Sequence, residues 1–278
     1  MKTQQVVIRT LQYLSLGGFL LYLGFPFLWL ISTAFKSPGE LNSLIVNLVP
    51  LQPTLDNFTA AFDAQGLVRA AWNSVFVSIL TTVIVIVISV PGAYMMARYR
   101  GKIRAMGSGW ILVSQIVPVA LFMLPLFVIL RMIGLIDSLG GLIVVYVVYT
   151  LPFSLWMLQG YVAAIPVDVE EAGATDGATK LQVLSSIVFP LLKPGLIATA
   201  IFTFVAAYNE FFFALVLLQS PDNFTLSVAL STFSNGEGLS QIGPLAAGAL
   251  IASIPSVIFF AILQRRLTGG LLAGAVKG

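Results

Sequence analysis

The side chains that could do chemistry in this chain are few and limited in kind. Its 278 residues contain 11 Asp and Glu, 14 Lys and Arg, and neither Cys nor His. Without Cys there is no disulfide and no thiolate metal site, and without His the commonest general base and metal ligand is missing. We therefore expect no catalytic residue, no metal site and no hydrolytic chemistry within this chain. Its carboxylates are left with structural or binding roles.

The densest group of carboxylates belongs to residues 169–194 and their flank, a polar island between two apolar segments. Asp168, followed by Glu171 three positions later, is a capping-box-like pair that predicts a short helix starting directly after Asp168. Asp176-Gly177 should end this helix, because Gly tolerates left-handed backbone angles and Asp can cap the next helix.

A second helix should follow the turn. Its apolar residues recur at helical spacing on one side, and they are Val183, Leu184, Ile187 and Val188. Pro190 and Pro194 should then restrict its continuation, because proline lacks the backbone N–H of a regular helix. Residues 169–194 are therefore predicted to form a helix–turn–helix between membrane spans, called the elbow below.

Glu210 is a carboxylate in an unusual setting, because it lies within the apolar run AAYNEFFF. A charged group at mid-bilayer costs roughly 2.5–3.5 kcal/mol, so Glu210 should face protein or water. Thr199 and Thr203 share its predicted helical face and make a small, polar stripe. Two roles stay open for Glu210, a place in a substrate pathway or pocket and a structural hydrogen bond at the seam between subunits.

Other residues in the apolar runs are candidates for a translocation pathway. Gln115 lies three residues before Pro118, and a proline that frees backbone carbonyls predicts a kink. Aromatic and hydroxyl groups around Tyr149 would suit stacking on, and hydrogen bonding to, a sugar ring, although ordinary helix packing is the other interpretation. The candidate pathway set is Gln115, Tyr149, Tyr208, Asn209 and Glu210.

These residues must be positioned by membrane-spanning helices. Hydrophobic residues make up 58% of the chain and charged residues 9%, compared with about 25% charged residues in soluble domains. A span needs roughly 20 apolar residues. Six runs are apolar enough, at about 11–34, 70–97, 108–130, 139–162, 196–218 and 244–263. We predict an all-α polytopic membrane protein with six transmembrane helices and a single domain over residues 1–278.

The positive charges predict the orientation of these spans. Of the 14 Lys and Arg, the predicted arrangement leaves Lys36, Arg69 and Arg131 on one side and all the others on the opposite side. The positive-inside rule then places both termini and the elbow in the cytoplasm. The basic run at residues 98–104 is explained by this topology, so no nucleic-acid partner is expected.

The elbow also carries a specific spacing, Glu171-Ala172-Gly173, then Gly177, then Ile187-Val188-Phe189-Pro190. This spacing resembles the cytoplasmic EAA loop of ABC-importer permeases, in which Gly173 would usually be Ala and Phe189 would usually be Leu. The resemblance implies a coupling helix that seats in a cleft of an ATP-hydrolysing subunit. The coupling residues it implies are Glu170, Glu171, Ala172, Gly173, Asp176, Gly177 and Pro190.

The last residues, LTGGLLAGAVKG, closely resemble the C-terminus of carbohydrate-importer permeases of the maltose-transporter type, in which the tail extends into the ATPase dimer. With Asn73-Ser74 and Gln115-x-x-Pro118, the resemblance covers most of the chain from the second span onward. It implies a coupling loop at 163–195 and a cytoplasmic tail at 264–278. It also implies a multi-pass protein of a bacterial or archaeal inner membrane.

By the same resemblance, the chain would be a transport subunit that binds no cofactor and does not hydrolyse ATP itself. Its partners would be a homologous second permease, forming a heterodimer, two ATP-binding subunits that hold ATP and Mg, an extracytoplasmic sugar-binding protein, and membrane lipid. The cargo would be a disaccharide or oligosaccharide, with polyols and glycerol phosphate open. The phosphate-binding pattern GxxxxGK[ST] does not occur in the sequence.

Two other classes of protein are weighed on the same residues. A self-sufficient secondary transporter of small solutes commonly shows duplicated halves with broken helices, and the first half of this chain has no counterpart of the elbow. An intramembrane enzyme would need His, Asp or metal ligands within the spans, where only Glu210 is ionisable well inside one. The permease is therefore the favoured interpretation.

Overall fold

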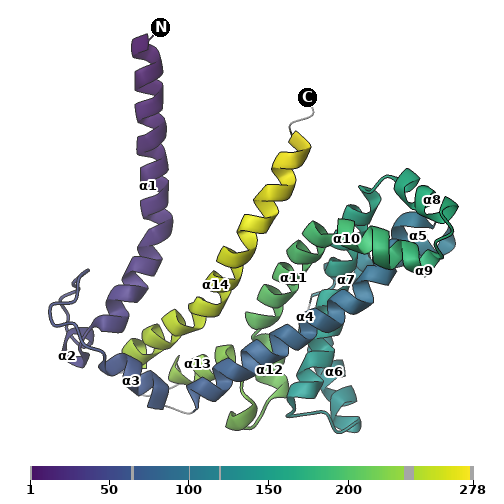
Figure 1. Cartoon of the computed structure of the whole chain (residues 1–278). Coiled ribbons are helices and arrows are strands. Elements are labelled where there is room, and N and C mark those ends of the chain that lie inside the picture. The colour runs from purple at the N-terminus through teal and green to yellow at the C-terminus, as the bar shows by residue number, and fades with distance from the viewer. Residues whose placement is uncertain (1, 64–65, 100, 119, 235–240, 276–278) are drawn as a thin grey trace. The chain divides into compact units, whose positions relative to one another are not determined.

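The computed structural model describes residues 2–63, 66–99, 101–118, 120–234 and 241–275, and within these ranges all regular structure is helical (Figure 1). This confirms the predicted all-α fold. The elements are α1 (Lys2–Phe35), α2 (Pro38–Leu41), α3 (Asp56–Asp63), α4 (Leu67–Arg98), α5 (Lys102–Ile116), α6 (Ala120–Met132), α7 (Leu139–Ala163), α8 (Val167–Thr175), α9 (Lys180–Gln182), the π-helix η1 (Val183–Val188), α10 (Phe189–Leu191), α11 (Lys193–Tyr208), α12 (Phe212–Leu217), the 3-10 helix η2 (Pro221–Asn223), α13 (Leu226–Ser234) and α14 (Ile242–Ala275).

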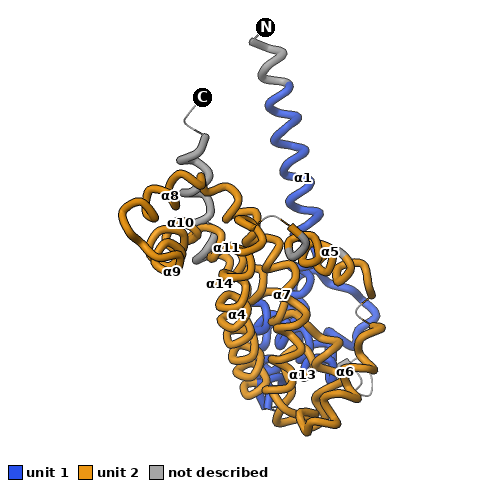
Figure 2. Tube along the Cα trace, turned by 90° about the vertical axis from the view of Figure 1, so that its right-hand side faces the viewer, with its two compact units in different colours: residues 1–67, 229–253 blue, residues 68–228, 254–278 orange. Residues whose placement is uncertain are grey.

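The helices group into two compact units, shown in different colours in Figure 2. One unit comprises residues 1–67 and 229–253, and the other comprises residues 68–228 and 254–278. The elbow, the candidate pathway residues and most of the apolar core belong to the second unit. The last three residues of the predicted tail, 276–278, lie outside the described residues.

Four helices are long and apolar enough to cross a membrane, at Ile8–Phe35, Leu67–Arg98, Leu139–Ala163 and Ile242–Ala261. Two bent pairs of shorter helices meet the same criterion when each pair is taken together, Arg104–Ile116 with Ala120–Met132 and Lys180–Leu191 with Lys193–Tyr208. The described residues therefore hold four to six candidate spans. The predicted six is reached only if each bent pair is one span.

The third predicted span is a broken element. α5 ends at Ile116, Val117 is extended, and α6 begins at Ala120. The two helices are bent by 105° relative to each other. Pro118 accounts for the break, because proline lacks a backbone N–H and disfavours helical angles in the residue before it. The sequence predicted a kink here, and the structure has a full change of direction.

The fifth predicted span is wrong as a single helix over 196–218. α11 ends at Tyr208 and α12 begins at Phe212, so Glu210 lies in the break between them. The sequence gives no warning of this break, because neither glycine nor proline occurs there. The break is instead due to the Glu210 side chain, which bonds to backbone N–H groups at the start of α12.

The core of the second unit is built around α7. Leu142 and Tyr146 of α7 are fully buried, and Val77 of α4 with Phe213 and Leu217 of α12 belong to the same cluster. Because lipid tails are as apolar as these side chains, close van der Waals packing holds such helices together in a bilayer.

α7 and α11 meet along a seam of small hydroxyl side chains. Ser154 Oγ and Thr203 Oγ1 lie 3.0 Å apart across it. Ser154 also lies 2.9 Å from the carbonyl of Thr150, and Thr203 lies 2.9 Å from the carbonyl of Thr199. Both hydroxyls therefore have an acceptor within their own helix as well as a neighbour across the seam. Small residues of this kind allow membrane helices to approach closely.

In the first unit, the short helix α3 is fixed to the end of α1 by one buried side chain. The Asn57 side-chain amide donates to the carbonyls of Ala34 at 2.9 Å and Lys36 at 2.7 Å. Lys36 Nζ in turn lies 4.4 Å from the centroid of the Trp29 ring. This cation–π contact places a positive charge and an aromatic ring together at the end of a span, where both suit the membrane–water interface.

Candidate functional site

The elbow begins differently from its prediction. α8 starts at Val167, directly after Pro166, and no side chain caps its N-terminus. Asp168 therefore lies inside the first turn, and the predicted Asp168 cap is wrong. Pro166, with φ −58° and ψ 136°, is the non-helical residue directly before α8, and its missing N–H costs little next to a helix start. The carboxylate still lies at the positive end of the helix dipole.

The turn of the elbow depends on one glycine. α8 ends at Thr175 with Asp176 as its C-cap, and Gly177 has a φ of 87°, which glycine adopts at little cost. Thr179 caps the next helix in a reciprocal pair with Gln182, whose side chain accepts from the Thr179 N–H at 2.8 Å. The predicted cap by Asp176 is therefore wrong. The Thr-x-x-Gln spacing was the signal that would have found the correct one.

The second arm of the elbow does not stop at its first proline. α9, η1 and α10 follow one another to Leu191, and the direction then changes by 74° before α11. Pro190 and Pro194 each lie in the first two positions of a helical segment, where a missing N–H costs little. The arm nevertheless ends at Leu191, one residue after Pro190, and Leu192 at the bend lies between the two prolines that were predicted to restrict the helix.

The inner side of the elbow is apolar and tightly packed. Val183 and Val188 are buried in a cluster with Leu158 of α7. Gly173 of α8 lies so close to the second arm that a Cβ added there would collide with Ile187 Cδ1. This contact gives a physical reason for glycine where relatives of the EAA pattern usually have alanine.

Most of the predicted coupling residues form the outer surface of the elbow. Gly173 and Glu170 face inward and are buried. The exposed residues are Glu171, Ala172, Asp176, Gly177 and Pro190. The exposed set combines a carboxylate pair with small residues around a tight turn. It therefore offers a compact surface that a partner protein can approach closely.

Glu170 is held inside by two residues of α4. Arg98 Nε and Nη2 each lie 2.7 Å from Glu170 Oε1, and the Tyr94 hydroxyl donates to Glu170 Oε2 at 2.8 Å. Arg98 Nη2 also donates to the carbonyl of Ile165 at 2.8 Å. The side chains of Arg98 and Glu170 are only 12% and 9% exposed. Glu170 thus joins the elbow to α4, a link that sequence spacing could not reveal.

A separate cavity of about 330 Å³ lies among α5, α6 and α7. Ser114 and Gln115 contribute a hydroxyl and an amide, and Trp110 and Tyr149 contribute aromatic rings. Tyr149 meets the ring of Phe213 edge to face at 5.7 Å between centroids. Phe213 of α12 also lines the cavity, and the remaining lining residues are Val117, Phe122, Leu126, Val145, Val148 and Pro152, so none of the lining side chains carries a formal charge.

The structure brings together two of the five predicted pathway residues. Gln115 and Tyr149 line the cavity, whereas Tyr208, Asn209 and Glu210 are not among its lining residues. Tyr208 is buried in the interior, and Asn209 is the C-cap of α11. Sequence analysis missed Trp110 and Ser114, which also line the cavity. Both belong to α5, and the full change of direction after this helix could not be predicted from the sequence alone.

Glu210 begins a helix. Its carboxylate accepts from the backbone N–H groups of Phe213 at 3.1 Å and Ala214 at 3.3 Å, which are free donors in the first turn of α12. The Tyr146 hydroxyl of α7 donates to Glu210 Oε2 at 2.9 Å. In the structure, Glu210 makes a structural hydrogen bond within the chain. The partner lies 64 residues away in sequence.

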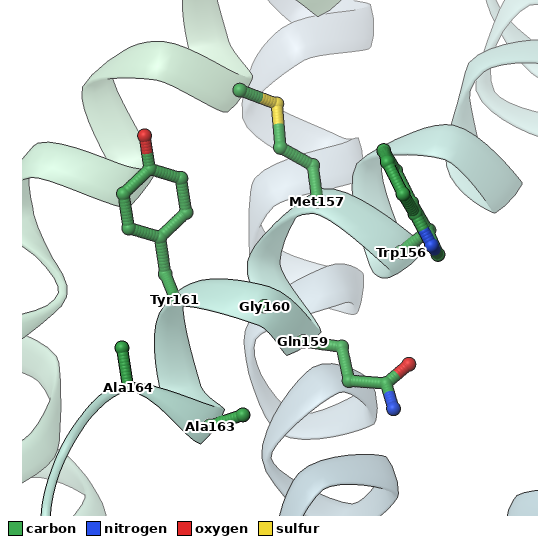
Figure 3. A pocket seen from close by; sticks show the side chains of 7 residues that line it. All are labelled: Trp156, Met157, Gln159, Gly160, Tyr161, Ala163 and Ala164. Atoms are coloured by element: carbon green, nitrogen blue, oxygen red, sulfur yellow. The ribbon is translucent and has the colours of Figure 1, made fainter.

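A larger hollow of about 560 Å³ runs along the end of α7 (Figure 3). All its lining residues come from α7 and the residue that follows it. Met157 and Tyr161 point to one side of this helix, and Trp156 and Gln159 point to the other. A hollow on the surface of one helix surrounds a small molecule poorly, so the smaller cavity is the better candidate site.

A polar network that sequence analysis missed joins two loops of the second unit. The Asp137 carboxylate accepts from the N–H groups of Gln219 at 2.9 Å and Ser220 at 3.0 Å, and from the Ser220 hydroxyl. The Asn223 amide donates to the Asp137 carbonyl at 2.6 Å. Burial acts to raise the pKa of Asp137, but the hydrogen bonds from Ser220, Gln219 and Asn223 lower that pKa to about 2.

The fold and these regions define a class, the polytopic helical membrane proteins with an exposed helical elbow and an uncharged cavity among their helices. Residues 89–271 match the family described as binding-protein-dependent transport system inner membrane component. The chain belongs to this family. It is therefore a multi-pass component of the inner membrane, and the resemblance to ABC-importer permeases is confirmed.

Relatives and solved structures agree with this assignment. A putative ABC transporter permease protein, ORF1 of Streptomyces antibioticus, is 51% identical over 229 residues, covering 82% of this chain and 100% of the relative. The trehalose transport system permease protein SugB of Mycobacterium tuberculosis is 35% identical over 254 residues, covering 91% and 92%. A chain of a bacterial ABC transporter involved in alginate import has the same fold, with a TM-score of 0.82 at 22% identity and coverage of 94% and 97%.

Proposed function

We propose that this chain is the permease subunit of an ATP-driven, binding-protein-dependent sugar importer that carries a neutral disaccharide or oligosaccharide. The observation that carries the proposal is the build of the elbow. Its outer surface exposes Glu171, Ala172 and the Gly177 turn, while its inner surface is packed against α7. A displacement of the outer surface of the elbow is therefore transmitted directly to α7.

The cavity supports the sugar class. Sugars are recognised by aromatic faces and by hydrogen-bonding groups, and Trp110, Tyr149, Ser114 and Gln115 supply both kinds. Its volume of about 330 Å³ falls within the range of roughly 300–1,000 Å³ typical of small-molecule sites. The uncharged lining favours a neutral sugar, as does the similarity to a trehalose permease.

The predicted orientation gives each surface a partner. With the elbow in the cytoplasm, its exposed residues contact an ATP-hydrolysing subunit, and two such subunits serve a heterodimer of this chain with a homologous permease. The loops at the opposite end of α4 then meet the extracytoplasmic sugar-binding protein. ATP and Mg belong to the ATPase subunits, and this chain carries no ATPase site and no cofactor of its own.

The test is sugar uptake by the complex that co-purifies with the tagged chain, reconstituted in proteoliposomes with its binding protein. We expect uptake of a labelled disaccharide only when ATP is supplied to the ATPase side. Tyr149→Ala should raise the KM for the sugar about tenfold, the factor that corresponds to about 1.4 kcal/mol of binding, with basal ATPase activity unchanged.

Trp156→Ala is the matched control, because it removes an aromatic ring from the hollow on α7 and should leave the KM unchanged. Uptake that proceeds without ATPase subunits would instead establish a self-sufficient secondary transporter. An unchanged KM in Tyr149→Ala would move the sugar pathway away from the cavity.

A further inference from the structure

The helix α4 is fixed at both ends to other parts of the second unit. It is continuous from Leu67 to Arg98, which at 1.5 Å per residue is roughly 48 Å. One end is bonded to the elbow, and the other is bonded to the loop that follows α12. α4 is long and apolar enough to cross a membrane, and in the predicted topology these two sets of contacts lie on opposite sides of it.

At the elbow end, α4 holds a buried charge. Tyr94 and Arg98 are four residues apart and share one face of the helix, so both reach Glu170 of α8. The two oxygens of Glu170 are bonded to different residues, and Arg98 also bonds the backbone just before α8 at Ile165. Separating α8 from α4 would leave two buried charges without partners, which is strongly unfavourable. The elbow and this end of α4 must therefore move together.

At the other end, side chains of α4 bond to the backbone of the loop that follows α12. The Asn73 amide donates to the carbonyls of Asp222 and Phe224, each at 3.0 Å. The Ser74 hydroxyl accepts from the N–H of Leu226 at 2.7 Å. Asn73 and Ser74 are both buried. An exposed ion pair of 2.7 Å between Arg69 and Asp222 continues the same contact.

α4 contains a proline, Pro91, in the part nearer to the elbow. Pro91 removes one backbone hydrogen bond of the helix. The next residue, Gly92, lies so close to α7 that a Cβ there would approach Leu155 Cδ2 to 2.7 Å. Directly after the proline, α4 is therefore packed closely against α7.

We propose that α4 acts as a connecting rod, which carries movement of the elbow to the loop of residues 219–226 and back. This inference rests on the proposed function, in which the elbow contacts the ATPase and the loop faces the binding protein. Arg98, Glu170, Asn73 and Ser74 are its positioning residues. Because the coupling of two binding sites is reciprocal, contact of the binding protein with the loop and contact of the ATPase with the elbow affect each other through the same helix.

The test measures transport and ATP hydrolysis on the same reconstituted complex. Arg98→Gln at one end and Asn73→Ala at the other should each lower the sugar transported per ATP at least fivefold. They should also abolish most of the stimulation by loaded binding protein, while basal ATPase activity stays within twofold of wild type. Arg104→Gln removes an exposed positive charge from the chain segment after α4 and is the control that should change neither.

Two further variants separate the rod from a merely structural role. The pair Arg98→Glu with Glu170→Arg should restore at least half of the coupling lost in Arg98→Gln. Because the chain contains no cysteine, Arg98→Cys with Glu170→Cys can be joined by a short thiol-specific cross-linker, and the joined complex should still transport. Loss of transport on joining, or transport and basal ATPase activity that fall in parallel, would overturn the rod.

Failure of the proposed function has a different signature. It shows in the wild-type complex, as absence of ATP-driven uptake. Failure of the rod shows only in the variants, against a wild-type complex that works.

Discussion

At the scale of single residues, three carboxylates of this chain hold separate segments together. Glu170 binds Arg98 and Tyr94 of α4, Glu210 binds Tyr146 and the start of α12, and Asp137 binds the loop at residues 219–223. A carboxylate suits this task because its two oxygens accept several hydrogen bonds at once. The cost of placing it among apolar helices is offset only if most of those bonds are made.

The hydrogen bonds around Asp137 predict how the stability of the protein depends on acid pH. Its folded-state pKa of about 2 lies below the value of roughly 3.9 for an unfolded aspartate, so the unfolded chain binds more protons between them. The stabilising contribution is therefore complete above about pH 4 and is lost as the pH falls toward about 2. In Asp137→Asn this part of the acid sensitivity should be absent, as measured by thermal unfolding of the purified protein at a series of pH values.

Asp63→Asn is the control for this measurement, because it removes an exposed carboxylate at the end of α3. That variant should keep the pH dependence of the wild type. The same acid sensitivity in Asp137→Asn as in wild type would show that the network around Asp137 does not contribute to stability.

The sequence allowed us to predict which charged residues need a polar partner, but not which residues those partners are. The cost of a charge in an apolar run correctly indicated that Glu210 needs a polar partner. Nothing local could identify Tyr146 as that partner, nor show that Glu210 starts a new helix. In the same way, Glu170 matched the coupling motif by its position, and only the fold shows that it faces Arg98 while Glu171 faces outward.

At the scale of elements, the elbow owes its shape to Gly177. Its φ of 87° is favourable for glycine and unfavourable by about 1–2 kcal/mol for other L-residues. No heavy atom lies within 4 Å of a Cβ added there, so a substitution acts on the backbone alone. Gly177→Val should therefore distort the turn, whereas Gly177→Asn should largely keep it because Asn tolerates the left-handed region.

The readout is the amount of ATPase subunit that co-purifies with the tagged chain. We expect a loss of about tenfold for Gly177→Val, which corresponds to about 1.4 kcal/mol, and less than twofold for Gly177→Asn. Equal losses in the two variants would mean that the side chain, and not the backbone angle, decides the contact with the ATPase.

Long apolar helices were predictable, and breaks within apolar runs were predictable only where proline marks them. α4, α7 and much of α14 fall where the hydropathy pattern placed spans. Pro118 signalled the break after α5, but the break after α11 arises from the Glu210 carboxylate and leaves no trace in periodicity. The caps of the elbow were assigned to aspartates, but in the structure Thr179 caps the second arm and α8 follows Pro166 without a side-chain cap.

At the scale of the whole molecule, the predicted orientation can be tested directly because the chain has no cysteine. Thr175→Cys places a thiol on the exposed end of α8, and Met132→Cys places one on the exposed end of α6. A membrane-impermeant maleimide applied to the outer face should label only Met132→Cys. Thr175→Cys should react after the membrane is permeabilised, and the reverse pattern would contradict the assignment from positive charges.

The hydroxyl pair in the seam between α7 and α11 affects how these two helices can move against each other. Ser154 and Thr203 can each release the other and keep a carbonyl acceptor in their own helix. By comparison, interlocked leucine side chains would have to change rotamer before two helices could shift, and a bidentate ion pair would have to break. A shift at this point of the seam therefore need not leave either hydroxyl without a hydrogen bond, whereas separation of a buried ion pair would leave two charges unpaired.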